Sequence, residues 1–331
     1  MKGKIAFEEH MATDETVADA KTTVGDFDQQ AVFTRQILDL GSERLERMDA
    51  NGIDYAILSL IAPGIQGILD TRKAIEVARR SNDVLAEAEA LHPNKYGSFA
   101  ALPMQDPDAA AAELTRCVKE LGFKGALVNG FTQKDVADSA IYYDIPEYRG
   151  FWATVAELDV PFYLHPRAQI AQRAQNYDGH KWMMTSPWGF AVETSIHALR
   201  LCGSGLFEDY PTLKICLGHL GENIPFGLDR MEERMQFSRR GYDGKRLPSD
   251  YFRENFHLTV SGNFSDPSFR CALDIMGVDK LYFSSDYPFE PMEDGSRWFD
   301  ASVAVDDATR RQVGRNNAIS LFKLEDKFAK T

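Results

Sequence analysis

The sequence predicts an α/β protein whose residues 1–331 form a single domain, a (β/α)8 TIM barrel. Eight short apolar runs alternate along the chain with longer amphipathic or polar segments, which is the order of strands and helices in such a barrel. Most of these runs are almost continuously apolar, as expected for parallel strands that are covered on both faces. A doubly wound open sheet would show the same alternation, but no glycine-rich phosphate loop follows the first run. The pattern therefore favours the barrel.

The apolar runs give the predicted strands, and the segments between them give the helices. Strands are expected at residues 4–10, 56–60, 97–102, 125–129, 160–165, 214–219, 256–262 and 280–286. A helix is predicted over 72–91, where apolar side chains recur on one face. Another begins at Asp106-Pro107, an N-cap acid followed by proline at the first helical position, and ends at Gly122. A last helix is expected over about 310–324.

The connection after the first strand is polar and runs to about Gln30. Loops of this length are unusual in compact α/β domains and often fold over a site. Further insertions are expected on the same face, because the chain is longer than the ~250 residues of a typical barrel.

Composition and charge exclude several classes of function. The formal net charge is -13 with no basic stripe to offset it, which argues against a nucleic-acid partner. No apolar run approaches the ~20 residues of a membrane helix, and the first run is too short and too acidic for a signal peptide. The four cysteines are scattered, without metal-type spacing, and are interpreted as reduced thiols. We expect a cytoplasmic protein.

The first strand ends in Glu8-Glu9-His10. Side chains alternate along a strand, so Glu8 and His10 point to one face and Glu9 points to the other. Two metal-capable groups on one face could form half of a chelate. The same residue pattern would also fit a polar strand end that is simply exposed to solvent.

Other predicted strands end in the groups that this half-chelate lacks. Asn129, His165, His219 and Asp286 each stand at a strand end, where the active site of a barrel lies. A lone strand-end histidine is more often structural, and Asp286 could simply cap the next turn. Three of the seven histidines nevertheless fall on this one rim, which favours a site.

A mixed nitrogen and oxygen ligand set for one divalent ion is predicted from Glu8, His10, His165 and Asp286. The carboxylates favour Mn²⁺ or Mg²⁺, and the imidazoles keep Zn²⁺ possible. Two carboxylates would neutralise the ion, so it would serve better to chelate an oxygen-rich substrate than to generate hydroxide.

Two further features extend the predicted site. His219 and Glu222 are spaced to pair as a dyad that handles a proton or orients the substrate. Arg230, on the helix after the sixth strand, could supply the cationic contact that an anionic substrate requires.

At these residues the sequence resembles the amidohydrolase superfamily, in particular its branch of hydroxybenzoate decarboxylases. The matching segments are Gly3 to His10, Gly125 to Gly130, Asp159 to Arg167, Leu217 to Glu222, Ser261 to Phe264 and Phe283 to Glu290, and the likeness continues to Phe322-Lys323-Leu324. Glu-x-His in the first strand is typical of the group acting on 2,6-dihydroxybenzoate. That group places an aromatic residue in the following loop, where this chain reads Lys21-Thr22-Thr23-Val24 and the nearest aromatic is Phe27.

The resemblance implies a barrel of amidohydrolase type and a set of residue roles. It implies that Mn²⁺ or Zn²⁺, with Mg²⁺ less favoured, is bound by Glu8, His10, His165 and Asp286. It implies that the substrate, a small aromatic acid, is contacted by Asn129, His219 and Arg230. It also implies a homodimer or homotetramer, and no organic cofactor is expected.

The leading hypothesis is a lyase that reversibly decarboxylates an ortho-hydroxybenzoate, for example 2,6-dihydroxybenzoate to resorcinol and CO2. In it, a protonated Asp286 gives its proton to the ring carbon that bears the carboxylate, and His219 and Glu222 assist. The alternatives are a metal-dependent hydrolase of a lactone or amide with Asp286 as base, and a catalytically silent barrel that binds a ligand. Fold alone does not separate them.

Overall fold

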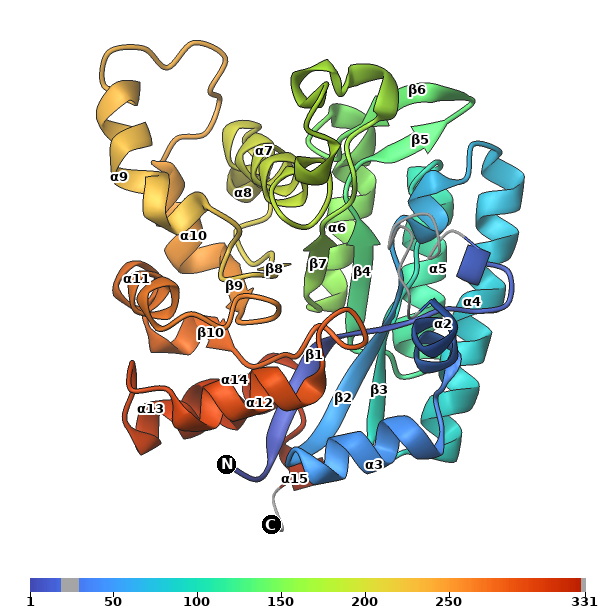
Figure 1. Cartoon of the computed structure of the whole chain (residues 1–331). Coiled ribbons are helices and arrows are strands. Elements are labelled where there is room, and N and C mark those ends of the chain that lie inside the picture. Colours follow the sequence, from blue (N-terminus) through green and yellow to red (C-terminus); the bar gives the residue numbers. More distant parts are fainter. Residues whose placement is uncertain (19–29, 329–331) are drawn as a thin grey trace.

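The structure is a computed structural model of the chain, and it describes residues 1–18 and 30–328. Eight parallel strands form one sheet in the order of the sequence, and the sheet curls into a nearly closed barrel surrounded by helices (Figure 1). The strands are β1 (Lys4–Met11), β2 (Ile53–Leu60), β3 (Tyr96–Ala100), β4 (Gly125–Asn129), β7 (Phe162–His165), β8 (Ile215–Leu217), β9 (Phe256–Thr259) and β10 (Leu281–Tyr282). The predicted (β/α)8 fold is confirmed.

Helices follow the strands and cover the outside of the barrel. They are α2 (Gln30–Leu38), α3 (Ser42–Ala50), α4 (Thr71–Leu91), α5 (Pro107–Lys119), α6 (Arg149–Leu158), α7 (Gly189–Gly203), α8 (Leu206–Asp209), α9 (Ile224–Met235), α10 (Pro248–Asn255), α11 (Asp266–Met276), α12 (Met292–Ala301), α13 (Asp307–Arg311), α14 (Asn317–Leu321) and α15 (Glu325–Phe328). The predicted cap of α5 is confirmed, because the Asp106 side chain accepts hydrogen bonds from the backbone of Asp108 and Ala109. None of the described helices is long and apolar enough to cross a membrane.

Short helical turns complete the connections. The 3₁₀ turns are η1 (Gly64–Gly67), η2 (Pro146–Tyr148), η3 (Ala171–Arg173), η4 (Gln175–Tyr177), η5 (Lys181–Met183) and η6 (Val278–Lys280). The predicted last helix is interrupted by a π-helical segment, η7 (Gln312–Asn316), between α13 and α14. A hairpin of β5 (Thr132–Lys134) and β6 (Val136–Ile141), which the sequence pattern did not predict, follows β4.

Four predicted strands end earlier than expected. β3, β8, β9 and β10 end at Ala100, Leu217, Thr259 and Tyr282, whereas strands were expected to continue to residues 102, 219, 262 and 286. Beyond three of these ends, His219, Gly262 and Asp286 have left-handed backbones, with φ of 53°, 63° and 66°. The residues after these strands therefore turn over the carboxyl end of the barrel.

The barrel closes between β1 and the segment that follows β10. The Ser284 hydroxyl accepts hydrogen bonds from the backbone N–H of Phe7 and Glu8, at 2.9 and 3.1 Å. The N–H of Asp286 donates to the Glu8 carbonyl at 3.1 Å, and the N–H of His10 donates to the Tyr287 carbonyl at 2.7 Å. These contacts define a seam, and three of the predicted metal ligands lie on it.

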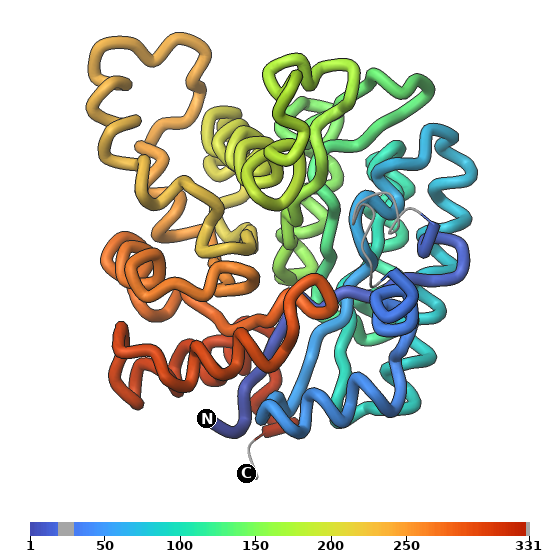
Figure 2. The backbone as a smooth tube through the Cα atoms, viewed as in Figure 1, coloured from blue at the N-terminus to red at the C-terminus, as the bar shows by residue number. Residues whose placement is uncertain are grey.

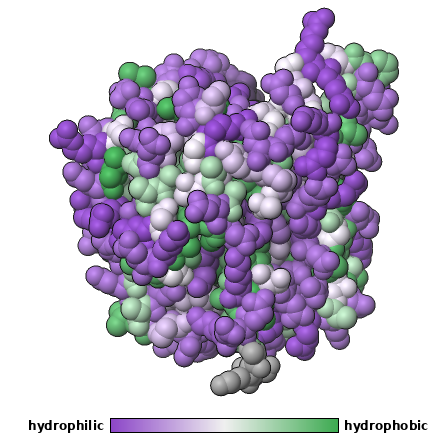
Figure 3. Space-filling model, turned by 180° about the vertical axis from the view of Figure 1, so that it is seen from behind, coloured by the Kyte–Doolittle hydropathy of each residue, from purple (hydrophilic) through white to green (hydrophobic). Residues whose placement is uncertain are grey.

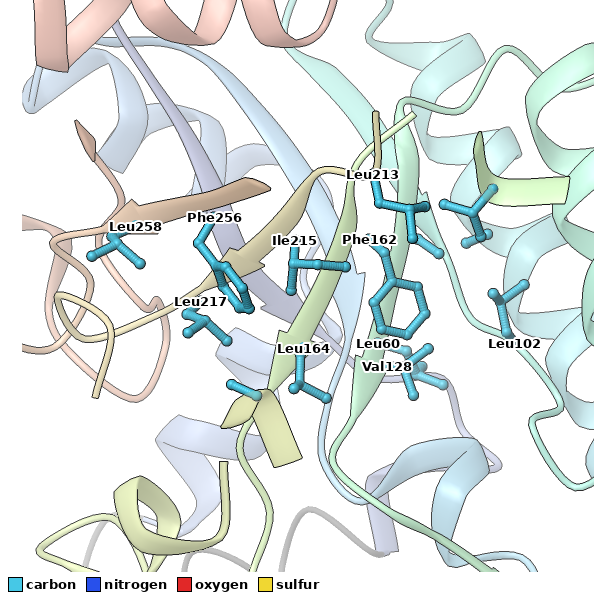
Figure 4. Packing of buried hydrophobic residues seen from close by; sticks show 14 of the residues in the cluster. Leu60, Leu102, Val128, Phe162, Leu164, Leu213, Ile215, Leu217, Phe256 and Leu258 are labelled. Carbon is cyan, nitrogen blue, oxygen red and sulfur yellow. The ribbon is translucent and has the colours of Figure 1, made fainter. Parts of the chain in front are cut away.

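Apolar packing fills both faces of the sheet. Inside the barrel, Phe7 makes edge-to-face ring contacts with Tyr282 and Phe322, with centroids 5.2 and 4.9 Å apart. Outside, side chains such as Ile215 and Leu258 pack between the strands and the surrounding helices (Figure 4). Because the interior is packed, the carboxyl end of the barrel is where a ligand site can form.

Candidate metal centre and active site

The structure brings together the four residues predicted as metal ligands. Glu8 and His10 come from β1, His165 ends β7, and Asp286 follows β10. All four are buried, and one ligand atom from each lies within 4.8 Å of the others. The cluster stands at the carboxyl ends of the strands.

Hydrogen bonds anchor one oxygen of Glu8 and leave the other free. Its Oε2 accepts from the hydroxyls of Thr259 (2.9 Å), Tyr163 and Ser261. Its Oε1 has no hydrogen-bond partner among the described residues and lies 3.5 Å from His165 Nε2. Gly218 leaves room for this arrangement, because a Cβ there would stand 2.7 Å from Oε1. Glu8 is thus held with one oxygen directed at the cluster.

Neighbouring polar groups orient the two histidines of the cluster. His165 Nδ1 lies 2.8 Å from Asn129 Oδ1, and the Asn129 amide donates to the carbonyls of Leu60 and Ile61. Since that amide nitrogen is already donating, Asn129 Oδ1 accepts and His165 carries its hydrogen on Nδ1. The Nε2 lone pair of His165 is therefore free. His10 is held similarly, with Nδ1 at 3.2 Å from the Ser59 hydroxyl.

The cluster contains buried polar atoms that the described protein leaves unsatisfied. Among the described residues, Glu8 Oε1, His10 Nε2 and Asp286 Oδ1 make no hydrogen bond of good geometry, although His10 Nε2 and Asp286 Oδ1 lie 3.3 Å from each other. Such groups are costly to bury unless something compensates them. A divalent cation would compensate all of them together, and oxygen and imidazole donors suit one. The residues present fit a bound metal ion.

Burial and neighbouring charges shift the pKa values of the cluster. Burial, with a contribution from Asp286, raises the pKa of Glu8 to about 7, while the charge of His219 opposes the rise. Burial alone would raise the pKa of Asp286, but contacts with His10 and His219 outweigh it and hold that pKa below its usual range. Burial and the nearby His10 lower the pKa of His165 well below its usual value. In the metal-free protein, Asp286 is anionic and His165 is neutral.

The predicted pairing of His219 with Glu222 is observed. His219 Nδ1 lies 2.8 Å from Glu222 Oε1, and Nε2 lies 3.6 Å from Asp286 Oδ2. Burial would lower the pKa of His219, but the charges of Glu222 and Glu8 outweigh it and raise that pKa well above its ordinary value. Both members of the pair have left-handed backbones, with φ of 53° and 59°. Such strained conformations cluster at functional sites, and here they direct a charged imidazole toward Asp286.

A cavity of about 440 Å³ opens above the cluster, a size suited to a small molecule. Its polar lining includes His165, His219, Asp286, Gln36, Thr185, Ser186 and Glu290, and its apolar lining includes Val32, Phe33, Phe190, Pro288 and Phe289. A neighbouring cavity is lined by Glu222, Asn223, Gly262 and Asn263, and shares His219, Asp286 and Glu290 with the first. No lysine or arginine is among the described residues that line either cavity.

The structure does not bring two predicted substrate contacts into the cavity. Asn129 is 2% exposed and lies behind His165, where it fixes the ring. Arg230 is exposed on α9 and lines neither cavity. The loop segment Lys21 to Val24 and Phe27 lie outside the described residues.

Sequence reasoning missed the hydroxyl groups that anchor Glu8, and the Phe289 and Glu290 side chains that line the cavity. Strand alternation offered a signal for Tyr163, which stands two residues before His165 and therefore faces the same side of β7. Thr259 is the last residue of β9, and its position at a strand end was a similar signal that it could contact the site.

The fold and the site together define a class: (β/α)8 barrel proteins with a metal-capable cluster of histidines and carboxylates at the carboxyl ends of the strands. The amidohydrolase family model, Amidohydro_2, matches residues 40–324, and the chain belongs to this family. Among curated relatives, it is 50% identical to a gamma-resorcylate decarboxylase of Rhizobium sp. (strain MTP-10005) over 328 residues, 98% of this chain and 99% of the relative.

Solved structures give the same result. A 2,6-dihydroxybenzoate decarboxylase complexed with 2,6-dihydroxybenzoate is 50% identical, with a TM-score of 0.95 over 98% of this chain and 100% of that one. A dihydroxybenzoic acid decarboxylase from Polaromonas sp. JS666, with bound manganese and the inhibitor 2-nitroresorcinol, is 47% identical, with a TM-score of 0.96 over 99% of both chains.

Proposed function

We propose that this protein is a carboxy-lyase that reversibly decarboxylates an ortho-hydroxybenzoate, with 2,6-dihydroxybenzoate as the leading substrate and resorcinol and CO2 as products. The observation that carries the proposal is the buried cluster of unsatisfied ligand atoms at the floor of a cavity, with Asp286 next to a charged His219. Full-length relatives at about 50% identity, all named as decarboxylases, support the same reaction class.

Glu8, His10, His165 and Asp286 would hold one divalent ion, Mn²⁺ or Zn²⁺, and the manganese in the Polaromonas structure supports the first. A bound ion would supply positive charge that attracts the anionic oxygens of the substrate. The donor set needs no organic cofactor.

The protein residues manage the proton. Asp286 is anionic in the free site, so it can accept the proton that the ortho hydroxyl loses when the substrate binds. It then gives that proton to the ring carbon that bears the carboxylate, a new C–H bond forms, and the C–C bond breaks to release CO2. His219, charged through its pairing with Glu222, steadies the carboxylate of Asp286 or of the substrate.

The hydrolase alternative is disfavoured. Hydrolysis would need a strongly polarised water, and two carboxylates in the ligand set weaken the Lewis acidity of the ion. The full-length curated relatives at about 50% identity are named decarboxylases rather than hydrolases.

Incubation of the manganese-loaded protein with 2,6-dihydroxybenzoate in D2O tests the proposal. We expect resorcinol and CO2, with deuterium only at the carbon that held the carboxylate. In concentrated bicarbonate the protein should carboxylate resorcinol. Resorcinol without ring deuterium would refute the proton transfer. Opening of a lactone with no consumption of any hydroxybenzoate would establish the hydrolase instead.

A homodimer or homotetramer is part of the proposal. Phe226 and Phe237, on and just after α9, are 89% and 79% exposed. Hydrophobic atoms are visible at the projecting corner of the molecule to which α9 belongs, as they are at several other places on a mainly hydrophilic face (Figure 3). Arg230 lies on the same helix. It lines neither cavity of its own subunit, so it can contact an anionic substrate only if assembly brings α9 of one subunit over the cavity of another. Light scattering of the wild type and of Phe226→Asp tests this, with a smaller mass expected for the variant.

Two interpretations of the whole chain are also proposed. Residues 1–331 work as one domain, which is supported by a single sheet that draws its strands from Lys4 to Tyr282. The protein is cytoplasmic, which is supported by four free cysteines, three of them buried.

A further inference from the structure

Two buried charged residues lie directly behind the metal-capable cluster and have no part in the proposed chemistry. Glu9, on β1, and Arg44, on α3, are both 0% exposed. Glu9 stands between two cluster residues in sequence, but its side chain points to the opposite face of the strand. The position is costly for a carboxylate, so its contacts call for an explanation.

The carboxylate of Glu9 holds the residue that precedes Asp286. Its Oε1 accepts from the backbone N–H of Ser285 at 2.8 Å, and its Oε2 accepts from the Ser285 hydroxyl at 2.7 Å. Both contacts cross the seam at which the barrel closes. Asp286 itself has a left-handed backbone, with φ of 66°, which a non-glycine residue keeps only when its surroundings hold it. Glu9 therefore fixes the chain where Asp286 needs support.

Arg44 holds the other side of the same seam. Its Nη2 donates to the carbonyl of His10 at 2.7 Å, and its guanidinium lies 4.9 Å from the ring centroid of Tyr287, the residue after Asp286. No ion pair within 4.0 Å joins Arg44 to Glu9 among the described residues, although the two charges are close enough to act on each other. Glu9 instead contacts Ser285, and Arg44 contacts His10 and Tyr287 while also donating to the carbonyls of Asp39 and Gln36.

We propose that Glu9 and Arg44 are positioning residues that hold Asp286 and His10 in place for the metal ion. Glu9 contacts one side of the seam and Arg44 the other. The two residues therefore keep the ligand atoms of Asp286 and His10 close together before an ion binds. Residues behind a metal site typically change metal affinity 10- to 100-fold when they are replaced. The inference rests on the proposed metal-dependent function, but it concerns metal binding rather than turnover.

The alternative is that these buried charges only stabilise the fold, and the chain offers a matched control. Lys4 lies on the same strand, is also 0% exposed, and pairs with Asp300 at 3.0 Å near the opposite end of β1. Lys4→Met and Glu9→Met each remove one buried ionisable group from β1, but only Glu9→Met disturbs the seam beside the cluster.

The experiment measures Mn²⁺ affinity by titration calorimetry, and the melting temperature of the metal-free proteins. We expect Glu9→Met to weaken Mn²⁺ binding tenfold or more, whereas Lys4→Met binds within about threefold of the wild type even where its melting temperature falls. Glu9→Gln should retain most of the affinity, since its amide oxygen can accept from the Ser285 N–H and its amide nitrogen can donate to the Ser285 hydroxyl.

Ser285→Ala provides a second route should Glu9→Met not fold. It removes one of the two contacts to Glu9, and about a threefold loss of affinity is expected. Mn²⁺ affinity unchanged in Glu9→Met, or in Ser285→Ala when Glu9→Met does not fold, with a loss of melting temperature like that of Lys4→Met, would overturn the proposal. A wild type that binds no Mn²⁺ would instead overturn the proposed function, so the two failures are distinguishable.

Discussion

The carboxyl-end rim of the barrel and helix α9 both carry residues that the sequence predicted for the site, but only those on the rim come together in the structure. On the rim, Glu8, His10, His165 and Asp286 converge within 4.8 Å. On α9, Arg230 is exposed and lines neither cavity. The helix itself lies at the edge of the molecule (Figures 1 and 2). A strand end in a barrel can face only one mouth, so residue type and position are enough to place it. A side chain on a helix surface can point in several directions. The spacing of residues along the chain therefore does not predict what an exposed arginine contacts.

The largest expected effect comes from breaking the rim. His165→Ala should abolish Mn²⁺ binding at micromolar metal and lower turnover by at least about 10³-fold, because the remaining groups lose the ligand that Asn129 orients. Added Mn²⁺ should raise the melting temperature of the wild type but not of the variant, since the ion binds only the folded site.

His180→Ala is the control for this variant, because His180 is exposed in the loop before η5. It should keep both the metal-dependent thermal shift and the activity. Full turnover by metal-free protein, verified by elemental analysis, would contradict the assignment of the rim cluster.

The rim could be predicted from the sequence because its signals are local. Each cluster residue follows an apolar run, and eight such runs define the barrel. The contacts behind the cluster could not be predicted, since the pairing of Glu9 with Ser285 depends on how β1 meets a segment 276 residues away. The ends of β9 and β10 were also predicted too late, because the strands stop at Thr259 and Tyr282, well before the left-handed backbones of Gly262 and Asp286.

The next effect tests the electrostatics of the rim. Glu8 must be ionised to bind metal, and its pKa is raised to about 7 in the metal-free site. Below that pH a proton competes with the ion, so apparent Mn²⁺ affinity should fall by up to about tenfold per pH unit, and by about 50-fold from pH 7, where Glu8 is half ionised, to pH 5. Above pH 7 this dependence should level off. Calorimetric titrations between pH 5 and 8.5 measure it.

The same group has an opposite effect on the metal-free fold. Because its folded pKa lies above the unfolded value, Glu8 contributes stability that is complete below about pH 4.5 and is lost as the pH rises through about 7. The stabilisation produced by saturating Mn²⁺ should therefore be larger at pH 8 than at pH 5.5. A metal-induced thermal shift that shrinks as the pH rises would contradict the buried, protonated Glu8.

A smaller effect tests the other side of the comparison. No lysine or arginine is among the described residues that line the two cavities, so His219 and the ion are the cationic partners they offer an anionic substrate. If Arg230 reaches the substrate in the assembled protein, Arg230→Ala should raise KM by roughly 30-fold, the equivalent of ~2 kcal/mol. Arg234→Ala, one turn further along α9, is the control. Unchanged kcat and KM in both variants would leave Arg230 as a surface residue and confine the site to the rim.

The smallest effect concerns Glu222, which lies where the two regions meet, between His219 and the start of α9. Glu222→Gln keeps the shape of the side chain and can still accept the hydrogen bond from His219 Nδ1, but it removes the charge that raises the pKa of the imidazole. His219 should then be neutral at a lower pH, and the support it gives to the carboxylate of Asp286 or of the substrate should weaken. We expect kcat to fall about tenfold with KM changed less than threefold, because the interaction matters most while charge moves in the reaction. The alkaline limb of the pH–rate profile should also move to lower pH, whereas Mn²⁺ affinity should change little, since Glu222 is not in the cluster. A variant that loses Mn²⁺ binding while its pH profile stays fixed would instead assign Glu222 to the support of the rim.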